Sequence, residues 1–172
     1  EGFQEPVAAQ AARFLKSKRT EVLEGIQCTE TLGHALSAEG LEFKLCHADL
    51  NGWNLLIDPA GGLYLVDWDT LILAPKERDL MFIGAGIWDS GRSAPQEVAL
   101  FYEGYGSAAI HPRAITYYRF ERILQDIGEY CESIFLSGAG EAQRRQSFEY
   151  LRSNFLPGGP LERACEFDQF RP

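Results

Sequence analysis

Apolar residues recur at three- and four-residue steps along most of the chain, a spacing that is typical of amphipathic helices with one buried face. Over residues 6–38 this pattern predicts one or two helices, with Pro6 in a first turn, where its missing N–H costs nothing. Further helices are predicted over residues 75–83, 94–105, 112–136, 141–155 and 160–167. The pattern therefore indicates a mainly helical protein.

The segment between residues 41 and 68 follows a different period. Residues 41–46 alternate between apolar and polar in the manner of a half-buried strand. Residues 55–57 and 63–66 are β-prone runs, and the Asp, Pro, Ala and Gly residues between them predict a hairpin turn. Because the chain shows neither a repeat nor a linker, we expect residues 1–172 to form one domain of mainly α structure with a small β-hairpin element (α+β), helical over 1–40 and 70–172.

The composition narrows the class of protein. With 172 residues, 45% of them hydrophobic, the chain can bury a real core. Its formal charge of −9 argues against nucleic acid or an anionic membrane as a partner and suits a cationic small molecule better. No apolar run reaches the roughly 18–20 residues of a membrane helix, and no signal peptide begins the chain, so we expect a cytoplasmic protein.

Cysteine spacing and the first residue add two expectations. The cysteines at positions 28, 46, 131 and 165 are scattered, which indicates reduced structural thiols instead of a disulfide framework or a zinc site. The chain begins with Glu1, and its single methionine is Met81, so we expect a processed or engineered chain or a piece of a longer one.

The candidate chemistry lies where the predicted strand ends. Beyond Cys46 come His47, Asp49 and Asn54, and the second strand of the hairpin delivers Asp67. A carboxylate at a strand end, an amide five residues later and a second carboxylate across a hairpin can converge on one point. Oxygen ligands of this kind suit Mg²⁺, which fills the rest of its octahedron with water and substrate phosphates.

These residues resemble a known family. The motif H-x-D-x-x-x-x-N, followed by a hairpin and a D-W pair, resembles the catalytic loop and metal segment of the aminoglycoside phosphotransferase family, which are kinase-like small-molecule phosphotransferases. Residues 45–49, 64–69, 73–84 and 117–123 are similar to its spectinomycin phosphotransferase branch. The resemblance implies a protein-kinase-like C-terminal lobe, with the catalytic loop and metal-binding hairpin in 41–69 and a helical substrate-side subdomain in 70–172.

The resemblance also implies a role for each matching residue. Asp49 would accept or orient the proton of the substrate hydroxyl as this hydroxyl attacks the γ-phosphate of ATP or another nucleoside triphosphate. Asn54 and Asp67 would hold Mg²⁺. His47 and Asp79 would support the catalytic loop without taking part in the chemistry.

Protein kinases are the nearest competing class. Protein kinases carry the motif H-R-D-L-x-x-x-N, followed by D-F-G and a later A-P-E. Here Ala48 replaces the Arg of that motif, Trp68 and Asp69 replace its Phe and Gly, and no A-P-E follows. A small-molecule acceptor is therefore preferred.

The resemblance covers only the family's C-terminal lobe. A working enzyme of this kind also needs a glycine-rich loop and a strand lysine over the phosphates. Before the predicted loop only Lys16, Lys18 and Lys44 occur, and no glycine-rich turn precedes Gly52. We therefore expect the chain to be inactive or weak without an N-terminal lobe, and to self-associate through the apolar face that such a lobe covers.

Two matters stay open at the level of sequence. A non-catalytic kinase-like binding or interaction domain is the alternative function, although such a module needs none of the three residues Asp49, Asn54 and Asp67. The acceptor is expected to be a cationic aminoglycoside or aminocyclitol, with choline-type, amino-acid and sugar substrates remaining open. Asp126 and Glu129, three residues apart on one helix face, are the candidates for acceptor contacts. Trp53 and Trp68 are expected to pack in the core or the loop.

Overall fold

The computed structural model describes residues 3, 5–85, 91–106 and 108–166. Its helices are α1 (Pro6–Ser17), α2 (Arg19–Ser37), α3 (Glu77–Leu80), α4 (Ala94–Tyr105), α5 (Pro112–Phe135), α6 (Glu141–Ser153) and α7 (Pro160–Glu166). Its strands are β1 (Lys44–Cys46), β2 (Leu55–Ile57), β3 (Leu63–Leu65) and β4 (Ile72–Ala74). Phe167, at the end of the last predicted helix, lies outside the described residues.

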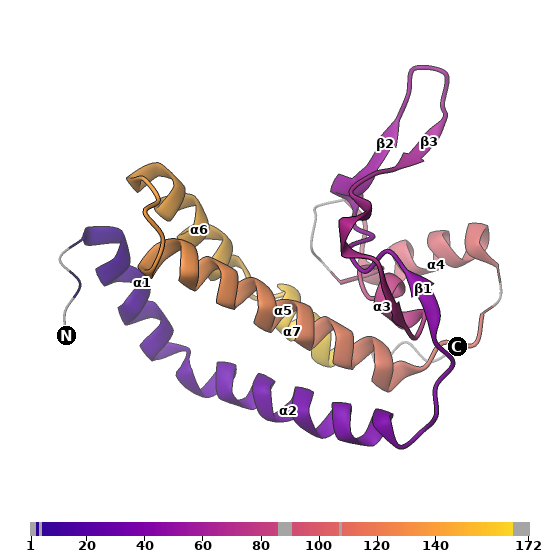
Figure 1. The fold of residues 1–172 in the computed structure, drawn as a ribbon, viewed down its shortest axis with the longest axis horizontal. Coiled ribbons are helices and arrows are strands. Elements are labelled where there is room, and N and C mark those ends of the chain that lie inside the picture. The colour runs from indigo at the N-terminus through magenta and orange to yellow at the C-terminus, as the bar shows by residue number, and fades with distance from the viewer. Residues whose placement is uncertain (1–2, 4, 86–90, 107, 167–172) are drawn as a thin grey trace.

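Helix α5 is the axis of the helical body. Helix α2 runs along one side of it, and α6 and α7 lie along another (Figure 1). The buried α5 residues Phe120, Ile123, Ile127 and Ile134 recur at three-, four- and seven-residue steps, so they form one stripe. This stripe packs against side chains from α1, α6 and α7, namely Val7, Ala8, Ala11, Phe148, Leu151 and Ala164.

The strands form two separate antiparallel pairs. In the first, Lys44 of β1 faces Ala74 of β4, and in the second, Leu55 of β2 faces Leu65 of β3. The β2–β3 hairpin was predicted, but β4 was not, because the pattern assigned residues 70–172 to helices. A three-residue strand carries too little periodicity to be recognised, and its partner β1 lies far away in the sequence. The helix predicted over 75–83 is likewise shorter, with only α3 in that region.

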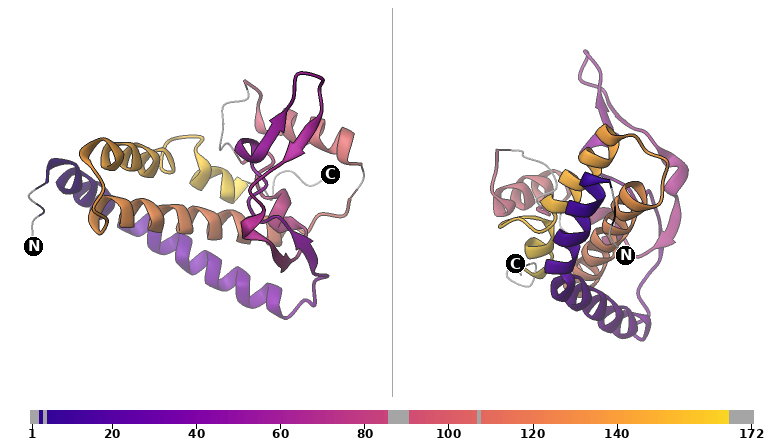
Figure 2. Two further views of the ribbon diagram at one scale, coloured as in Figure 1. Left: turned by 45° about the horizontal axis from the view of Figure 1, so that its top comes forward. Right: turned by 90° about the vertical axis from the view of Figure 1, so that its left-hand side faces the viewer.

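The β2–β3 hairpin projects away from the helical body in the view of Figure 1 and in the right-hand view of Figure 2. Every residue of both strands is exposed, with Ile57 74% and Leu63 63% accessible. A two-stranded ribbon that is apolar on both faces gains little from its own packing. Self-association through the face that an N-terminal lobe covers stays a prediction.

No helix among the described residues is long and apolar enough to cross a membrane. Cys28, Cys46 and Cys131 are free thiols in the structure.

Cys46 predicts a measurable pH dependence of stability. Its thiol is buried beside the carbonyl oxygen of Ala74, and burial, with Asp79 nearby, raises its pKa to about 11. Because the unfolded thiol ionises near its ordinary pKa of about 8.5, this contribution to stability is complete below that pH and is lost as the pH rises toward the folded pKa. We expect the free energy of unfolding to fall more steeply between about pH 8.5 and 10.5 in the wild type than in Cys46→Ala. Denaturant titrations at several pH values measure the free energy of unfolding. The same dependence of this free energy on pH in both proteins would contradict the prediction.

Candidate active site

Asp79 holds the turn that follows β1. Its Oδ2 accepts a hydrogen bond from the backbone N–H of His47 at 3.0 Å, and its Oδ1 accepts one from Ala48 at 2.7 Å. Ala48 has a φ of +67°, a left-handed conformation that residues other than glycine rarely adopt. The paired hydrogen bonds hold the backbone in this shape, so Asp79 lies where a supporting role requires it.

His47 ties the loop to the end of β3. Its buried ring places Nε2 2.9 Å from the carbonyl oxygen of Val66, while Nδ1 accepts from the backbone N–H of Asp49 at 3.3 Å. These partners place the ring proton on Nε2, since a carbonyl oxygen cannot donate. Thr70 Oγ1 donates to the backbone carbonyl of His47, and the centroids of the Trp68 ring and the imidazole lie 4.8 Å apart. With both nitrogens engaged, His47 braces the loop.

Asn54 lies beside Asp49 at the end of the short 3₁₀ turn Gly52–Asn54. Its Nδ2 donates to the backbone carbonyl of Asp49 at 2.8 Å and to Asp49 Oδ2 at 3.0 Å. No described residue donates to Asn54 Oδ1, so this amide oxygen is left for another partner. The side chain is buried, and its orientation is fixed by the loop.

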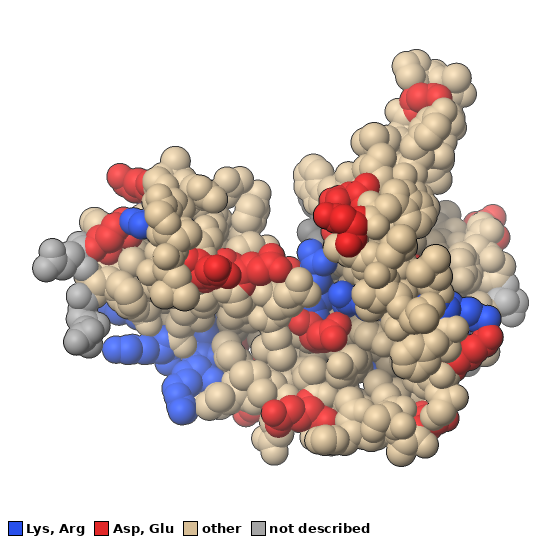
Figure 3. All heavy atoms as spheres, viewed as in Figure 1, with Lys and Arg blue, Asp and Glu red and all other residues tan. Residues whose placement is uncertain are grey.

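Asp67 follows β3 in a left-handed conformation, with a φ of +66°. A hydrogen bond with Asp69 and the negative charge of that residue raise its pKa, and Asp49 adds to the effect. Carboxylates are therefore concentrated at the base of the hairpin, where Figure 3 shows acidic side chains gathered. Such a concentration is stabilised by a cation.

The donor set at this point fits Mg²⁺. Asp67 and the amide oxygen of Asn54 are hard oxygen ligands, and Mg²⁺ commonly takes one or two carboxylates from the protein and the rest from water and phosphates. Within the described part of the chain, no group of three or more His, Cys, Asp and Glu side chains is arranged to hold a metal. A dedicated all-protein site, of the kind Zn²⁺ uses, is therefore not found there.

Arg122 of α5 joins the loop to the helical body. Its Nη1 donates to Asp49 Oδ1 at 2.5 Å, and its Nε donates to Asp126 Oδ1 at 2.8 Å. Burial opposes the charge of the guanidinium, but the two carboxylates outweigh burial, and the pKa of Arg122 is raised. Both oxygens of the Asp49 carboxylate are thus oriented, one by Asn54 and the other by Arg122.

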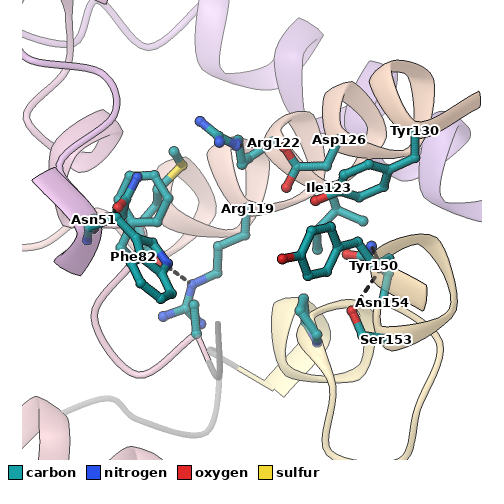
Figure 4. A pocket seen from close by; sticks show the side chains of 14 residues that line it. Asn51, Phe82, Arg119, Arg122, Ile123, Asp126, Tyr130, Tyr150, Ser153 and Asn154 are labelled. Atoms are coloured by element: carbon teal, nitrogen blue, oxygen red, sulfur yellow. Dashed lines mark hydrogen bonds and ion pairs between the residues drawn. The ribbon is translucent and has the colours of Figure 1, made fainter. Parts of the chain in front are cut away.

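A cavity of about 360 Å³ is lined by Arg122, the residue that donates to this carboxylate, although Asp49 is not part of the lining. Figure 4 shows it between α5 and α6, with the Arg122 and Asp126 side chains at one side and the rings of Tyr130 and Tyr150 facing the space. The molecule is visibly hollowed between the hairpin and α6 (Figure 3). The residues that line the cavity are Asn51, Trp53, Met81, Phe82, Ala85, Arg119, Arg122, Ile123, Asp126, Tyr130, Tyr150, Ser153, Asn154 and Pro160. A volume of this order suits a small molecule.

Arg119 shapes the floor of the cavity. Its buried guanidinium donates to the backbone carbonyls of Met81 at 2.8 Å and Ile83 at 2.5 Å. Burial lowers its pKa to about 10, which leaves it charged at neutral pH. It therefore fixes the segment after α3 against α5.

The structure separates the two residues expected to contact the acceptor. Asp126 lines the cavity, whereas Glu129 accepts a hydrogen bond from Gln125 and lines a different surface groove. Trp68 packs on His47 as expected, but the packing expected for Trp53 is wrong, because this side chain is 80% exposed at the cavity rim. A three-residue spacing identifies a shared helix face but not the cavity that each side chain reaches.

Sequence reasoning missed Arg122 as a site residue. The four-residue step from Arg122 to Asp126 is a signal for an ion pair on one helix face. Its contact with Asp49, 73 residues away, depends on how α5 packs against the loop and has no local signal.

Comparisons with known proteins point to a family and to solved structures. A model of the phosphotransferase enzyme family (APH) matches residues 3–119. The crystal structure of spectinomycin phosphotransferase APH(9)-Ia in complex with ADP and spectinomycin is 31% identical, with a TM-score of 0.83, covering 99% of this chain and 51% of that one. Its AMP-bound complex is 32% identical, with a TM-score of 0.78, covering 96% and 50%. The chain thus spans about half the length of these structures. Among curated proteins, no sequence matches it.

Proposed function

Because this chain belongs to the phosphotransferase enzyme family, we propose that it carries the catalytic half of an ATP- and Mg²⁺-dependent enzyme that phosphorylates a hydroxyl group of a small molecule. The family resemblance and the mainly helical, kinase-like fold class inferred from the sequence are both confirmed by the relatives. The observation that carries the proposal is the convergence of Asp49, Asn54 and Asp67, with Arg122 linking Asp49 to a cavity of small-molecule size.

Asp49 is the proposed catalytic residue. An acceptor bound in the cavity would present its hydroxyl to the carboxylate, the hydroxyl oxygen would attack the γ-phosphorus, and ADP would leave as the bond to its β-phosphate oxygen breaks. Asp49 orients the hydroxyl and takes its proton. Asn54 and Arg122 hold the two carboxylate oxygens, so the group is positioned before the substrate arrives.

The remaining loop residues hold the phosphate-donor side. Asn54 Oδ1 and Asp67 would hold Mg²⁺, which neutralises charge on the phosphates when bound. His47 and Asp79 keep the loop in place through backbone hydrogen bonds. The solved relatives contain ADP and AMP, which supports an adenine nucleotide as the donor. The use of ATP also favours the cytoplasmic location expected from the sequence.

The proposed acceptor is a cationic aminoglycoside or aminocyclitol. The cavity offers the Asp126 carboxylate together with the rings of Tyr130 and Tyr150, and aromatic faces beside a carboxylate favour an organic cation. One solved relative contains spectinomycin, which supports an aminocyclitol.

Asp67→Ala tests the phosphate-donor side. We expect calorimetric titration with ATP to show binding that is stronger with Mg²⁺ than without it, and Asp67→Ala to remove this difference, because the variant lacks a metal ligand. Glu132→Gln removes one exposed carboxylate of α5 and is the matched control. Metal-dependent ATP binding that survives in Asp67→Ala would contradict the assigned role.

Phosphate transfer to spectinomycin tests the reaction itself. Since the relatives are about twice as long, we expect the 172-residue chain alone to turn over slowly. Two results together would favour the non-catalytic binding domain. Spectinomycin binding would be unchanged in Asp49→Asn and Asp67→Ala, and no phosphate would be transferred even after the other half of the relative is fused to the chain.

A further inference from the structure

Trp53 is the most exposed of the aromatic side chains that line the cavity between α5 and α6. It is 80% accessible, whereas Tyr150 is 50% accessible and Phe82 is buried. Within the described part of the chain, its ring has no aromatic or cationic partner, and its indole N–H has no hydrogen-bond acceptor. The indole is therefore available for contact with a ligand.

The backbone that carries Trp53 is fixed to the loop of Asp49. Asn51 Oδ1 accepts a hydrogen bond from the backbone N–H of Trp53 at 2.8 Å, and the Asn51 N–H donates to the carbonyl of Asp49 at 2.8 Å. Asn54, the next residue, donates from its backbone N–H to the carbonyl of Asn51 at 3.2 Å and from its side chain to Asp49. The turn beneath the indole is thus ordered before a ligand arrives, which lowers the entropic cost of binding.

The other aromatic rings of the cavity are already engaged. Phe82 is buried, and the guanidinium carbon of Arg122 lies 5.8 Å from the centre of its ring. Tyr130 and Tyr150 pack on each other, with their ring centroids 5.9 Å apart. Figure 4 shows Phe82 on one side of the cavity and these two tyrosines on the other. On the side of Phe82, Trp53 is therefore the aromatic residue with a free surface.

These features favour a ligand with a flat apolar face. The C–H groups on one face of a saturated sugar or cyclitol ring can lie against an indole, while the hydroxyl groups point outward from the edge of the ring. A ring stacked on Trp53 would present this edge to residues of the same loop, among them Asp49. An open-chain molecule has no such face and covers little of the indole.

We propose that Trp53 is the stacking surface for the acceptor, and that the acceptor carries the phosphorylated hydroxyl on a saturated ring. This inference rests on the proposed function and deepens it. It favours sugars and cyclitols over choline-type and amino-acid substrates. It also assigns a binding role to a side chain that the amino-acid pattern assigned to packing.

Removal of the indole should weaken binding of a cyclic ligand. We expect Trp53→Ala to weaken binding of spectinomycin, used as the cyclic probe, by about tenfold, because the apolar contact with the ring is lost. Trp53→Phe keeps a smaller aromatic face, so we expect a loss of about threefold or less. Leu136→Ala removes a similarly exposed apolar side chain outside the cavity and is the matched control, with unchanged binding.

Calorimetric titration of the 172-residue chain measures binding, and thermal unfolding measures the stability of each variant. Because Trp53 is mostly exposed, we expect Trp53→Ala to unfold at the same temperature as the wild type. Tryptophan fluorescence supplies a second readout, since an indole covered by a ligand emits differently from an indole in water. We expect spectinomycin to change the emission of the wild type and not that of Trp53→Phe.

Spermidine tests whether the effect depends on the ring. It is an open-chain cation, so we expect its weak binding to be the same in the wild type and Trp53→Ala. In a chain completed with the other half of the relative, we expect Trp53→Ala to raise the KM for spectinomycin and to leave kcat nearly unchanged, because the lost contact is made equally in the bound state and the transition state.

Unchanged spectinomycin binding in Trp53→Ala overturns the inference, as does absence of spectinomycin binding to the wild type. A lower unfolding temperature of Trp53→Ala, together with an equal loss of binding for both probes, shows a structural role of Trp53 and also overturns it. The expected binding pattern without any phosphate transfer, even in the completed chain, supports Trp53 as a stacking surface for cyclic ligands and overturns the proposed function instead.

Discussion

Asp49→Asn lowers the rate of phosphate transfer by about three orders of magnitude and leaves ATP binding nearly unchanged. A positioned general base contributes about 10²- to 10⁴-fold to a rate, and an amide cannot take the proton of the acceptor hydroxyl. The substitution keeps an oxygen for Arg122, so the arrangement of Arg122 and Asp126 is retained. The loss therefore reports on chemistry and not on folding.

Single-turnover measurements with ATP, Mg²⁺ and spectinomycin give the rate, and calorimetry gives the affinity for ATP. Glu132→Gln again removes one carboxylate outside the site and keeps the wild-type rate. If Asp49→Asn retained a rate within tenfold of the wild type, Asp49 would not be the residue that accepts the proton, and the role assigned by the resemblance would have to be withdrawn.

Asp79→Ala reduces the free energy of unfolding by about 3 kcal/mol, since a hydrogen bond to a charged group contributes about 1.5–3 kcal/mol and two are lost. The carboxylate accepts from two successive backbone N–H groups, at His47 and Ala48. Both residues are buried, so these donors are left without their acceptor. Ala48 is also released from the left-handed conformation that the two bonds maintain.

We expect the same variant to lose phosphate transfer by about a hundredfold even at temperatures where it is folded, because misplacement of a catalytic group by about 1 Å has that effect. Denaturant titration measures the stability. Asp79→Asn is the second variant to compare. Its amide keeps one acceptor oxygen, so we expect this variant to lose about half as much stability as Asp79→Ala. Wild-type stability in Asp79→Ala would show that other contacts hold the loop.

The amino-acid sequence by itself determined the local features of this protein. The helix over residues 112–136 was predicted to within one residue of α5, because its apolar stripe repeats at helical spacing and Pro112 begins it. The hairpin over 55–66 followed from its turn residues. The residues proposed for catalysis and metal binding were identifiable because His47, Asp49 and Asn54 are close in sequence and Asp67 lies across one short hairpin.

Only the tertiary structure decided what surrounds these residues. The β4 strand, the contact of Arg122 with Asp49 and the separation of Asp126 from Glu129 each depend on how distant segments pack. Helical periodicity states which face is buried, but it does not state against which partner. The loop proposed for phosphate transfer is a local structure and can be recognised in the sequence. The cavity proposed for the acceptor is formed between helices and the loop and exists only once the chain has folded.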